Sequence, residues 1–240
     1  MKQSIQSLLI WVVGALLLGV LFLAMAFLSV LLYPFDRKRK IVHAQCFWWA
    51  DAVTALNPYW DVKVTGLENI DPKKTYVAVS NHQSLADIVL MYKTKMQFKW
   101  VAKESLFKIP VLGWNMRLAR HIRLRRGDFS SIKKVYREAG EWLQRGVSVV
   151  FFPEGTRSDN DDMGTFQNGA FKLAIKKKVP VLPIVIEGTK DAIPKGSWRF
   201  TTRTSCAIRI FPSIDTSNFL PKDFARLREL TRKHYHNSAG

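Results

Sequence analysis

The longest apolar segment lies near the start of the chain, where 26 consecutive residues, Leu8 to Tyr33, carry no charged side chain. At ~1.5 Å per residue a helix of this length is ~39 Å long, which exceeds the ~30 Å hydrocarbon core of a bilayer. Because proline is absent until Pro34, we expect one continuous helix that can span a membrane with tilt. A cleaved signal peptide ending near residues 24–26 and a re-entrant pair of helices that breaks at a glycine are the alternatives.

After residue 60, short apolar runs of strand length alternate with segments of helical period. This alternation predicts an α/β domain in which helices flank a largely parallel sheet. Pro183 lies inside one apolar run, which favours an end or edge position for that strand. The expected strands are 76–80, 98–102, 122–124, 147–152, 181–187 and 204–211, and the expected helices are 84–91, 130–145, 170–178 and 222–236. The helix over 130–145 has the strongest period, with Asp128 suited to cap its start and Gly146 its end.

The charge balance is strongly basic, with 37 Lys and Arg against 19 Asp and Glu and a formal net charge of +18. Such an excess indicates an anionic partner: nucleic acid, a phospholipid surface or an acidic substrate. Four cations in residues 37–40 follow the apolar segment directly, whereas only Lys2 precedes it. By the positive-inside rule this asymmetry places the rest of the chain on the cytoplasmic side of a membrane, beside its phospholipids. We expect no nucleic-acid partner, because the lipid is nearer and no nucleic-acid motif is present.

These features predict two parts, a membrane anchor with a basic flank over residues 1–40 and a single domain over residues 41–240. No repeat, low-complexity stretch or long linker divides the second part. The aromatic side chains of residues 41–60 suit either a water–lipid interface or a core. Cys46 and Cys206 are the two cysteines, which excludes a disulfide framework.

The first candidate for chemistry is the polar segment that follows the expected strand 76–80, with Asn81, His82 and Asp87. On a straight helix His82 and Asp87 would point roughly 140° apart, so they meet only if a strand-to-helix turn folds the histidine back. A carboxylate on one imidazole nitrogen would then fix the tautomer and let the other nitrogen accept a proton from a hydroxyl. Alternatively, Ser84 and Asp87 form a capping box and His82 is a turn residue.

The second candidate follows the expected strand 147–152, where Glu154, Gly155, Thr156 and Arg157 come after a proline. Glycine lets the backbone approach a ligand closely, and a guanidinium fork suits phosphate oxygens. An exposed turn with an internal ion pair between Glu154 and Arg157 is the alternative. We expect no metal site, and we interpret Asp159, Asp161 and Asp162 as solvated because their loop lacks an EF-hand pattern.

Together, N-H-x4-D at residues 81–87, F-P-E-G-T-R-S at residues 152–158 and the basic stretch between them resemble the glycerolipid acyltransferase family. The 1-acyl-glycerol-3-phosphate acyltransferases are the most similar members, and the resemblance covers roughly residues 60–190. Residues 103–114 and 179–184 look like lesser blocks of the family. The hydrophobic N-terminus fits the family too, although some members build it as a two-helix hairpin.

The resemblance implies a role for each matching residue. His82 would be the general base and Asp87 its partner, whereas Glu154, Gly155 and Arg157 would contact the glycerol phosphate of the acceptor. Arg126 matches the usual arginine of the family's second block, but Arg125 stands where many members have an acidic residue, so either arginine could contact the phosphate. The complete set of substrate-binding candidates is Asn81, Lys103, Arg125, Arg126, Glu154, Gly155, Thr156 and Arg157.

The implied reaction moves an acyl group from acyl-coenzyme A or acyl-carrier protein to the sn-2 hydroxyl of lysophosphatidate, which yields phosphatidic acid for phospholipid biosynthesis. A thioester is already activated, so a base, alignment and charge stabilisation suffice, and no cofactor is expected beyond the acyl donor itself. Two alternatives stay open: an acyltransferase for another lyso-lipid, such as a lysophospholipid or lyso-aminolipid, and a non-enzymatic, membrane-anchored lipid-binding protein.

Overall fold

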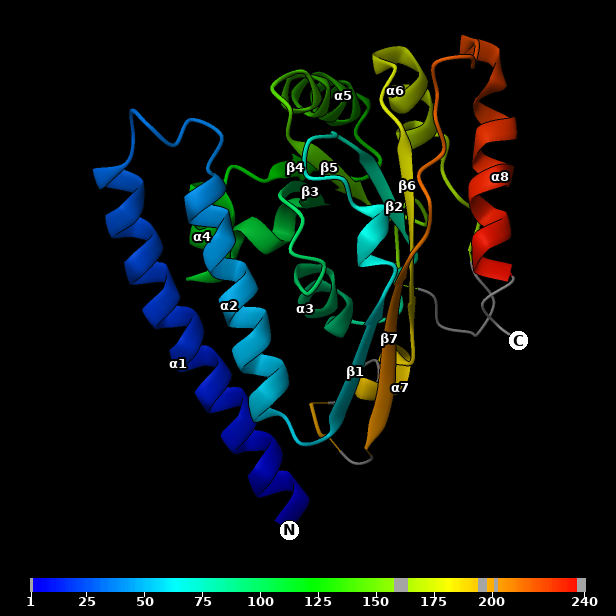
Figure 1. Cartoon of the computed structure of the whole chain (residues 1–240). Coiled ribbons are helices and arrows are strands. Elements are labelled where there is room, and N and C mark those ends of the chain that lie inside the picture. The colour runs from blue at the N-terminus through cyan, green and yellow to red at the C-terminus, as the bar shows by residue number, and fades with distance from the viewer. Residues whose placement is uncertain (1, 158–163, 194–197, 201–202, 237–240) are drawn as a thin grey trace.

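The computed structural model describes residues 2–157, 164–193, 198–200 and 203–236. Its helices alternate with strands along most of the chain (Figure 1). The helices are α1 (Lys2–Leu31), α2 (Lys40–Leu56), α3 (Ala86–Tyr92), α4 (Leu112–Leu118), α5 (Phe129–Gln144), α6 (Gly169–Lys177), α7 (Thr189–Ala192) and α8 (Phe224–His236). The strands are β1 (Trp60–Thr65), β2 (Val77–Ser80), β3 (Phe98–Lys103), β4 (Ile122–Leu124), β5 (Ser148–Phe151), β6 (Val181–Glu187) and β7 (Thr204–Ile210).

Within the described residues these strands form one seven-stranded sheet in the order β1-β7-β6-β2-β5-β3-β4. Neighbouring strands run parallel except for β6 and β7, which are antiparallel. The prediction of an α/β domain with a largely parallel sheet is therefore confirmed. Because β2 and β5 are parallel neighbours, the two polar segments that follow them leave the sheet at the same edge.

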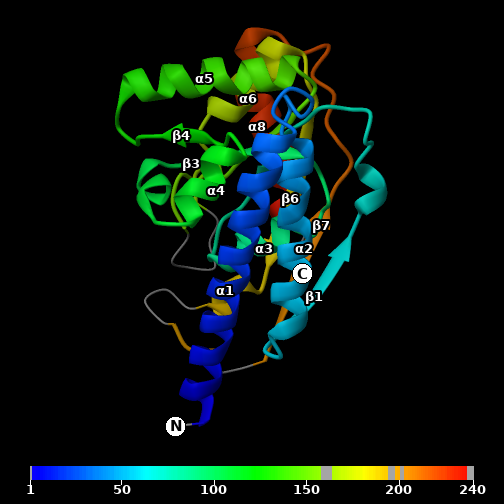
Figure 2. The ribbon, with the colours of Figure 1, turned by 90° about the vertical axis from the view of Figure 1, so that its left-hand side faces the viewer.

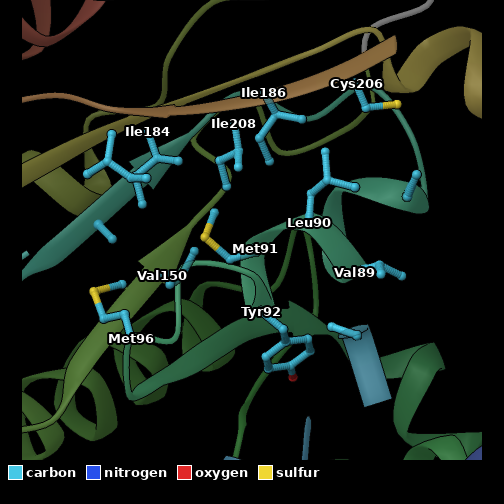
Figure 3. Close-up of a cluster of buried hydrophobic side chains, with 14 of the residues drawn as sticks. Val89, Leu90, Met91, Tyr92, Met96, Val150, Ile184, Ile186, Cys206 and Ile208 are labelled. Atoms are coloured by element: carbon cyan, nitrogen blue, oxygen red, sulfur yellow. The ribbon is translucent and has the colours of Figure 1, made fainter. Parts of the chain in front are cut away.

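Side chains alternate between the two faces of the sheet, and each face is covered by its own helices. On β2, Ala78 joins a core cluster with α2 and α3, whereas Val77 and Val79 join a second cluster with α5, α6 and α8. Figure 3 shows part of the first cluster, where Leu90 and Met91 of α3 pack near Ile184 and Ile208 of the sheet. Burial on both faces explains why the central strands are apolar throughout rather than alternating.

Of the two positions expected for Pro183, the edge is wrong, because β6 lies between β7 and β2, whereas Pro183 does lie near the start of its strand. The β6–β7 ladder ends at the pair of Ile184 and Ile210, and the next pairing joins Val181 to Ile214, one residue out of register. Pro183 therefore lies at a bulge, where its carbonyl accepts the N–H of Phe211 and its missing N–H interrupts no regular ladder.

The N-terminal region is a hairpin of two helices that lie side by side on one flank of the domain (Figures 1 and 2). Helix α1 is continuous over 30 residues, as expected, and does not break at a glycine. Helix α2 was not expected; it begins where the Asp36 carboxylate accepts the N–H groups of Lys40 and Ile41, at 2.7 and 3.0 Å. Phe47 and Trp60 are core residues, but Trp48 is 70 % exposed, so the aromatic residues of this region divide between core and surface.

Helix α1 stays in contact with the domain along its whole length. Near its start, Ser7 Oγ accepts the backbone N–H of Phe200, and the Trp11 ring stacks on the Phe200 ring. Near its end, Met25 is buried with Val42 of α2. Its opposite face carries large apolar side chains that are exposed, among them Leu16, Val20, Leu23, Phe27 and Val30. The basic flank also differs from expectation: Arg39 is buried, with its guanidinium near the Ser29 carbonyl, so three of the four cations are exposed. The division of the chain at residue 40 stays a prediction.

Candidate active site

The turn between β2 and α3 brings His82 onto Asp87, as the spacing required. His82 Nδ1 lies 2.7 Å from Asp87 Oδ2. The chain stays non-helical from Asn81 to Leu85, which folds the imidazole back over the first turn of α3. Asp87 is fully buried, whereas the His82 side chain is 15 % exposed. The imidazole also stacks on Phe152, with ring centroids 4.1 Å apart and planes inclined by 11°.

The same carboxylate also holds the backbone of the turn. Asp87 Oδ2 accepts the N–H groups of Gln83 and Ser84, at 2.7 and 2.9 Å. The pairing is therefore observed, whereas only one half of the capping box forms: Asp87 accepts the N–H of Ser84, but no side chain caps the N-cap residue Leu85. These donors fix the rotation of the carboxylate, which suits it to orient the imidazole. The other oxygen, Oδ1, is hydrogen-bonded to the Thr189 hydroxyl.

Asn81 precedes the histidine and is tied to the sheet. Its Nδ2 donates to the carbonyl of Ile186 at 2.7 Å, and its Oδ1 accepts the N–H of the same residue at 2.8 Å. These two hydrogen bonds to β6 continue the sheet beyond the end of β2. The geometry gives Asn81 a structural role, and its expected role in substrate binding remains a prediction.

The second polar segment meets the first through Glu154, which is buried rather than part of an exposed turn. Glu154 Oε1 accepts the N–H of His82 at 2.8 Å, and Oε2 accepts the N–H of Gly164 at 2.9 Å. The two polar segments thus lie side by side, and Glu154 holds the backbone of the histidine in place. Ser158, Asp159, Asp161 and Asp162 lie outside the described residues.

A cavity of about 550 Å³ opens beside His82 and extends from α1 to α6. Apolar side chains from α1 to α4 line one part of it, including Leu18, Met25, Ile88 and Met116. Lysine and arginine side chains line another part: Lys103 at the end of β3, Arg126 after β4 and Lys172 on α6. Such a cavity can hold a molecule with a long apolar tail and an anionic head.

The structure separates the two adjacent arginines that the sequence left undecided. Arg125 is 63 % exposed and pairs with Glu104 at 2.8 Å and Asp128 at 3.5 Å. The hydrogen bond from Arg125 lowers the pKa of the Glu104 carboxyl below its ordinary value. Arg126 is exposed as well, but it lines the cavity, whereas Arg125 does not. In the 154–157 segment, Gly155 lines the cavity and has φ +73°. Thr156 is exposed and Arg157 is half-buried, and neither is among the residues that line the cavity.

Two contacts of the His82–Asp87 pair were not predicted from the sequence. Phe152 was expected as the end of an apolar strand and as part of the second motif, but its contact with the imidazole was not. Thr189 lies 102 residues beyond Asp87 in the chain. To predict that Thr189 lies beside Asp87, one would have to know that the chain crosses over to place β6 next to β2.

Comparisons with known proteins agree with this geometry. A family model described as acyltransferase matches residues 61–187. The chain belongs to the acyltransferase family. Among curated relatives, it is 39 % identical over 178 residues to a 1-acyl-sn-glycerol-3-phosphate acyltransferase of Chlamydomonas reinhardtii, covering 73 % of this chain and 53 % of that protein. It is 35 % identical over 175 residues to the human 1-acyl-sn-glycerol-3-phosphate acyltransferase alpha, covering 71 % of this chain and 61 % of that protein. The chain spans about half the length of several of these relatives.

A solved structure shares the fold of this family member. The crystal structure of the 1-acyl-sn-glycerophosphate acyltransferase PlsC from Thermotoga maritima superposes with a TM-score of 0.70 at 31 % identity, and the match covers 91 % of each chain. The family resemblance read from the two motifs is thereby confirmed, together with the fold class.

Proposed function

We propose that this chain transfers an acyl group from a thioester to the sn-2 hydroxyl of 1-acyl-glycerol-3-phosphate and releases phosphatidic acid. The observation that carries the proposal is the imidazole of His82, which is held by Asp87 and lines a cavity with both apolar and cationic walls. The printed names of the relatives above support lysophosphatidate as the acceptor. The donor is acyl-coenzyme A or acyl-carrier protein, both of which are acidic and suit the basic chain.

The reaction needs one positioned base. With its Nδ1 proton held by Asp87, His82 accepts the proton of the acceptor hydroxyl on Nε2 while the hydroxyl oxygen attacks the thioester carbonyl carbon. The tetrahedral intermediate then collapses, the carbon–sulfur bond breaks, and the imidazolium returns the proton to the leaving thiolate. No covalent acyl-enzyme is required, and the charge of the imidazolium is balanced by the buried carboxylate of Asp87.

The membrane supplies the acceptor. We propose that the exposed apolar face of α1 lies in the lipid, with Arg37, Lys38 and Lys40 beside anionic headgroups on the cytoplasmic side. Because α1 also lines the cavity through Leu18, a lysolipid can enter from the bilayer with its chain against apolar walls.

The test is an acyl-transfer assay on the purified protein in phospholipid nanodiscs, with lysophosphatidate and each of the two donors. We expect His82→Ala to lower the rate about 10²- to 10⁴-fold, which is the usual effect of removing a positioned base. His234→Ala on α8 is the matched control and should keep the wild-type rate, because α8 lies on the other side of the sheet from α3.

Three outcomes would contradict the proposal. Wild-type protein that forms no phosphatidic acid with either donor excludes the reaction. An equal rate with lysophosphatidylcholine excludes a preference for a phosphate monoester and favours another lyso-lipid. A His82→Ala variant with the wild-type rate excludes His82 as the base, and an unchanged cellular effect of that variant favours the non-enzymatic, lipid-binding alternative.

A further inference from the structure

Thr189 contacts the oxygen of Asp87 that faces away from the histidine. Thr189 is the first residue of α7 and is fully buried, as is Asp87. Its hydroxyl is hydrogen-bonded to Asp87 Oδ1, whereas His82, Gln83 and Ser84 all bind Oδ2. The two oxygens of the carboxylate therefore have different partners, and Thr189 is the partner on the far side.

The direction of this hydrogen bond follows from the acceptors around the hydroxyl. The Thr189 hydroxyl has one proton, and two oxygens lie near it: Asp87 Oδ1 and, at 3.4 Å, Gln83 Oε1. A charged carboxylate is the stronger acceptor, and it is also the closer of the two. The hydroxyl thus donates to Asp87, which leaves the negative charge of the carboxylate with donors on both oxygens.

The chain is built to place Thr189 at this point. Gly188 immediately before it has φ +75°, a conformation that residues with a side chain rarely adopt. A Cβ atom at Gly188 would lie 2.1 Å from the carbonyl oxygen of Ser205 on β7. The turn after β6 is therefore pressed against β7, and this close approach directs the first residue of α7 toward α3.

Thr189 provides one of three links from the segment 186–193 to the turn that carries the histidine. Asn81 is bonded to Ile186 at the start of the turn, and Ser84 Oγ donates to the Ile193 carbonyl at 3.1 Å in its middle. The hydrogen bond from Thr189 to Asp87 is the third link. It alone of the three acts on a group that touches the imidazole.

We propose that Thr189 is a positioning residue for the general base. Its hydroxyl holds the carboxylate of Asp87 in the rotation that points Oδ2 at His82 Nδ1, so that Nε2 faces the cavity. Without this donor, Oδ1 is a buried acceptor without its hydrogen bond, and the carboxylate is free to turn away from the imidazole. The inference rests on the proposed function, because it concerns the base of that reaction.

The test compares Thr189→Val, which keeps the shape and removes the hydroxyl, with Thr189→Ser, which keeps the hydroxyl. We expect the valine variant to lower kcat about 10-fold or more with KM for lysophosphatidate unchanged, and the serine variant to recover most of the rate. The acid limb of the kcat/KM profile should move to lower pH in the valine variant. The reason is that a carboxylate turned away from Nδ1 stabilises the protonated imidazole less.

Thr231→Val is the matched control, since Thr231 is also fully buried and its hydroxyl donates to a backbone carbonyl, that of Leu227. It should leave both kcat and the pH profile unchanged. If Thr189→Val fails to fold, Thr189→Ala takes its place, because alanine cannot overfill the site. A folded variant without the hydroxyl that keeps the wild-type kcat and pH profile overturns the proposal, as does a serine variant no more active than valine.

A second measurement does not depend on turnover. In protein with ¹⁵N-labelled histidine, the imidazole signals of His82, assigned with His82→Gln, report its titration in wild type and variants. A titration that moves in Thr189→Val but not in Thr189→Ser supports the link, and identical titrations overturn it. Wild-type protein without acyl transfer would instead contradict the proposed function, so the two failures are distinguishable.

Discussion

Arg125 and Arg126 are adjacent in the chain but have different surroundings. Arg125 pairs with two carboxylates on the surface, whereas Arg126 lines the cavity that holds the histidine. Exposed ion pairs contribute little to stability, and the guanidinium of Arg125 is already engaged by Glu104. A guanidinium that faces a cavity can instead bind a phosphate with two parallel hydrogen bonds.

We therefore expect Arg126→Ala to raise KM for lysophosphatidate about 10- to 100-fold, which corresponds to the loss of one charged hydrogen-bond partner. The maximal rate should change less, because the base is intact. Steady-state kinetics over a range of lysophosphatidate concentrations measures both quantities. Arg125→Ala is the control and should change KM less than about 3-fold. The opposite order would mean that the surface arginine turns into the cavity to bind the phosphate.

At this scale the sequence predicted the residues whose partners lie close in the chain. His82 and Asp87 are five residues apart, and the turn between them was foreseeable because a strand ends on one side and a helix starts on the other. Glu154 was predicted as a site residue, but its bond to the backbone of His82 was not, since it depends on the pairing of β2 with β5. A carboxylate in a sequence does not show whether it binds substrate or backbone.

Among the elements, the turn from β6 to α7 depends on a single glycine. At Gly188 a side chain would meet two obstacles, the positive φ and the carbonyl of Ser205 at 2.1 Å. Gly127 has the same sign of φ, +76°, but no atom lies within 4 Å of its would-be Cβ. A side chain at Gly127 would therefore cost backbone strain alone, whereas a side chain at Gly188 would cost backbone strain and a steric clash.

We expect Gly127→Ala to lower the free energy of unfolding by about 1 kcal/mol, the usual cost of a left-handed conformation. Gly188→Ala should lower it by about 3 kcal/mol or more, because β6 and β7 must also move apart. Urea unfolding followed by tryptophan fluorescence measures both changes. Equal losses in the two variants would show that β7 yields to the added methyl group at no cost.

The sequence predicted elements with a strong period and missed those without one. Helix α5 was placed within a residue, and Asp128 caps it by accepting the N–H of Ser131 at 3.1 Å. Helix α2 was missed because its aromatic residues face both the core and the surface, which blurs the helical period. Strand β1 has alternating apolar and polar residues and was recognisable in principle. The central position of β6 was not, since Pro183 favours an edge until the bulge beside it is known.

In the molecule as a whole, the free energy of unfolding depends on pH because two histidines, His43 and His121, are buried between the helical hairpin and the sheet. Burial, and next the charge of Lys99, lowers the pKa of His43 from 6.5 to about 3. Burial also holds the pKa of His121 well below its ordinary value. Below about pH 6.5 the unfolded chain binds a proton on His43 that the folded protein does not bind. The free energy of unfolding therefore falls as the pH drops from about 6.5 to about 3.

We expect His43→Phe to remove part of this acid sensitivity, up to about 1.4 kcal/mol per pH unit between pH 6.5 and 4.5. Phenylalanine suits the site because Phe47, Tyr92 and Phe98 surround the ring. Urea unfolding at several pH values gives the slope for each protein, and the difference between wild type and variant isolates His43 from the carboxylates. A variant with the wild-type slope would mean that the folded protein protonates His43 as readily as the unfolded chain.

The outward face of α1 determines how the whole molecule meets a membrane. Contacts from Ser7 to Met25 keep the helix on the domain, so lipid that covers its exposed face lies against a helix whose Leu18 and Met25 line the cavity. We expect the triple variant Leu16→Ser, Val20→Ser, Leu23→Ser to bind anionic vesicles at least about 100-fold more weakly, since each exposed apolar side chain contributes about 1.5 kcal/mol or more in lipid. Vesicle co-flotation measures this loss, and the variant should stay folded because these side chains face outward.

The control is the double variant Leu67→Ser, Leu220→Ser, which changes two exposed leucines away from α1 and should bind as wild type. Unchanged binding by the triple variant would place the lipid contact elsewhere on the domain, and the acceptor would then have to reach His82 by a route that does not pass α1.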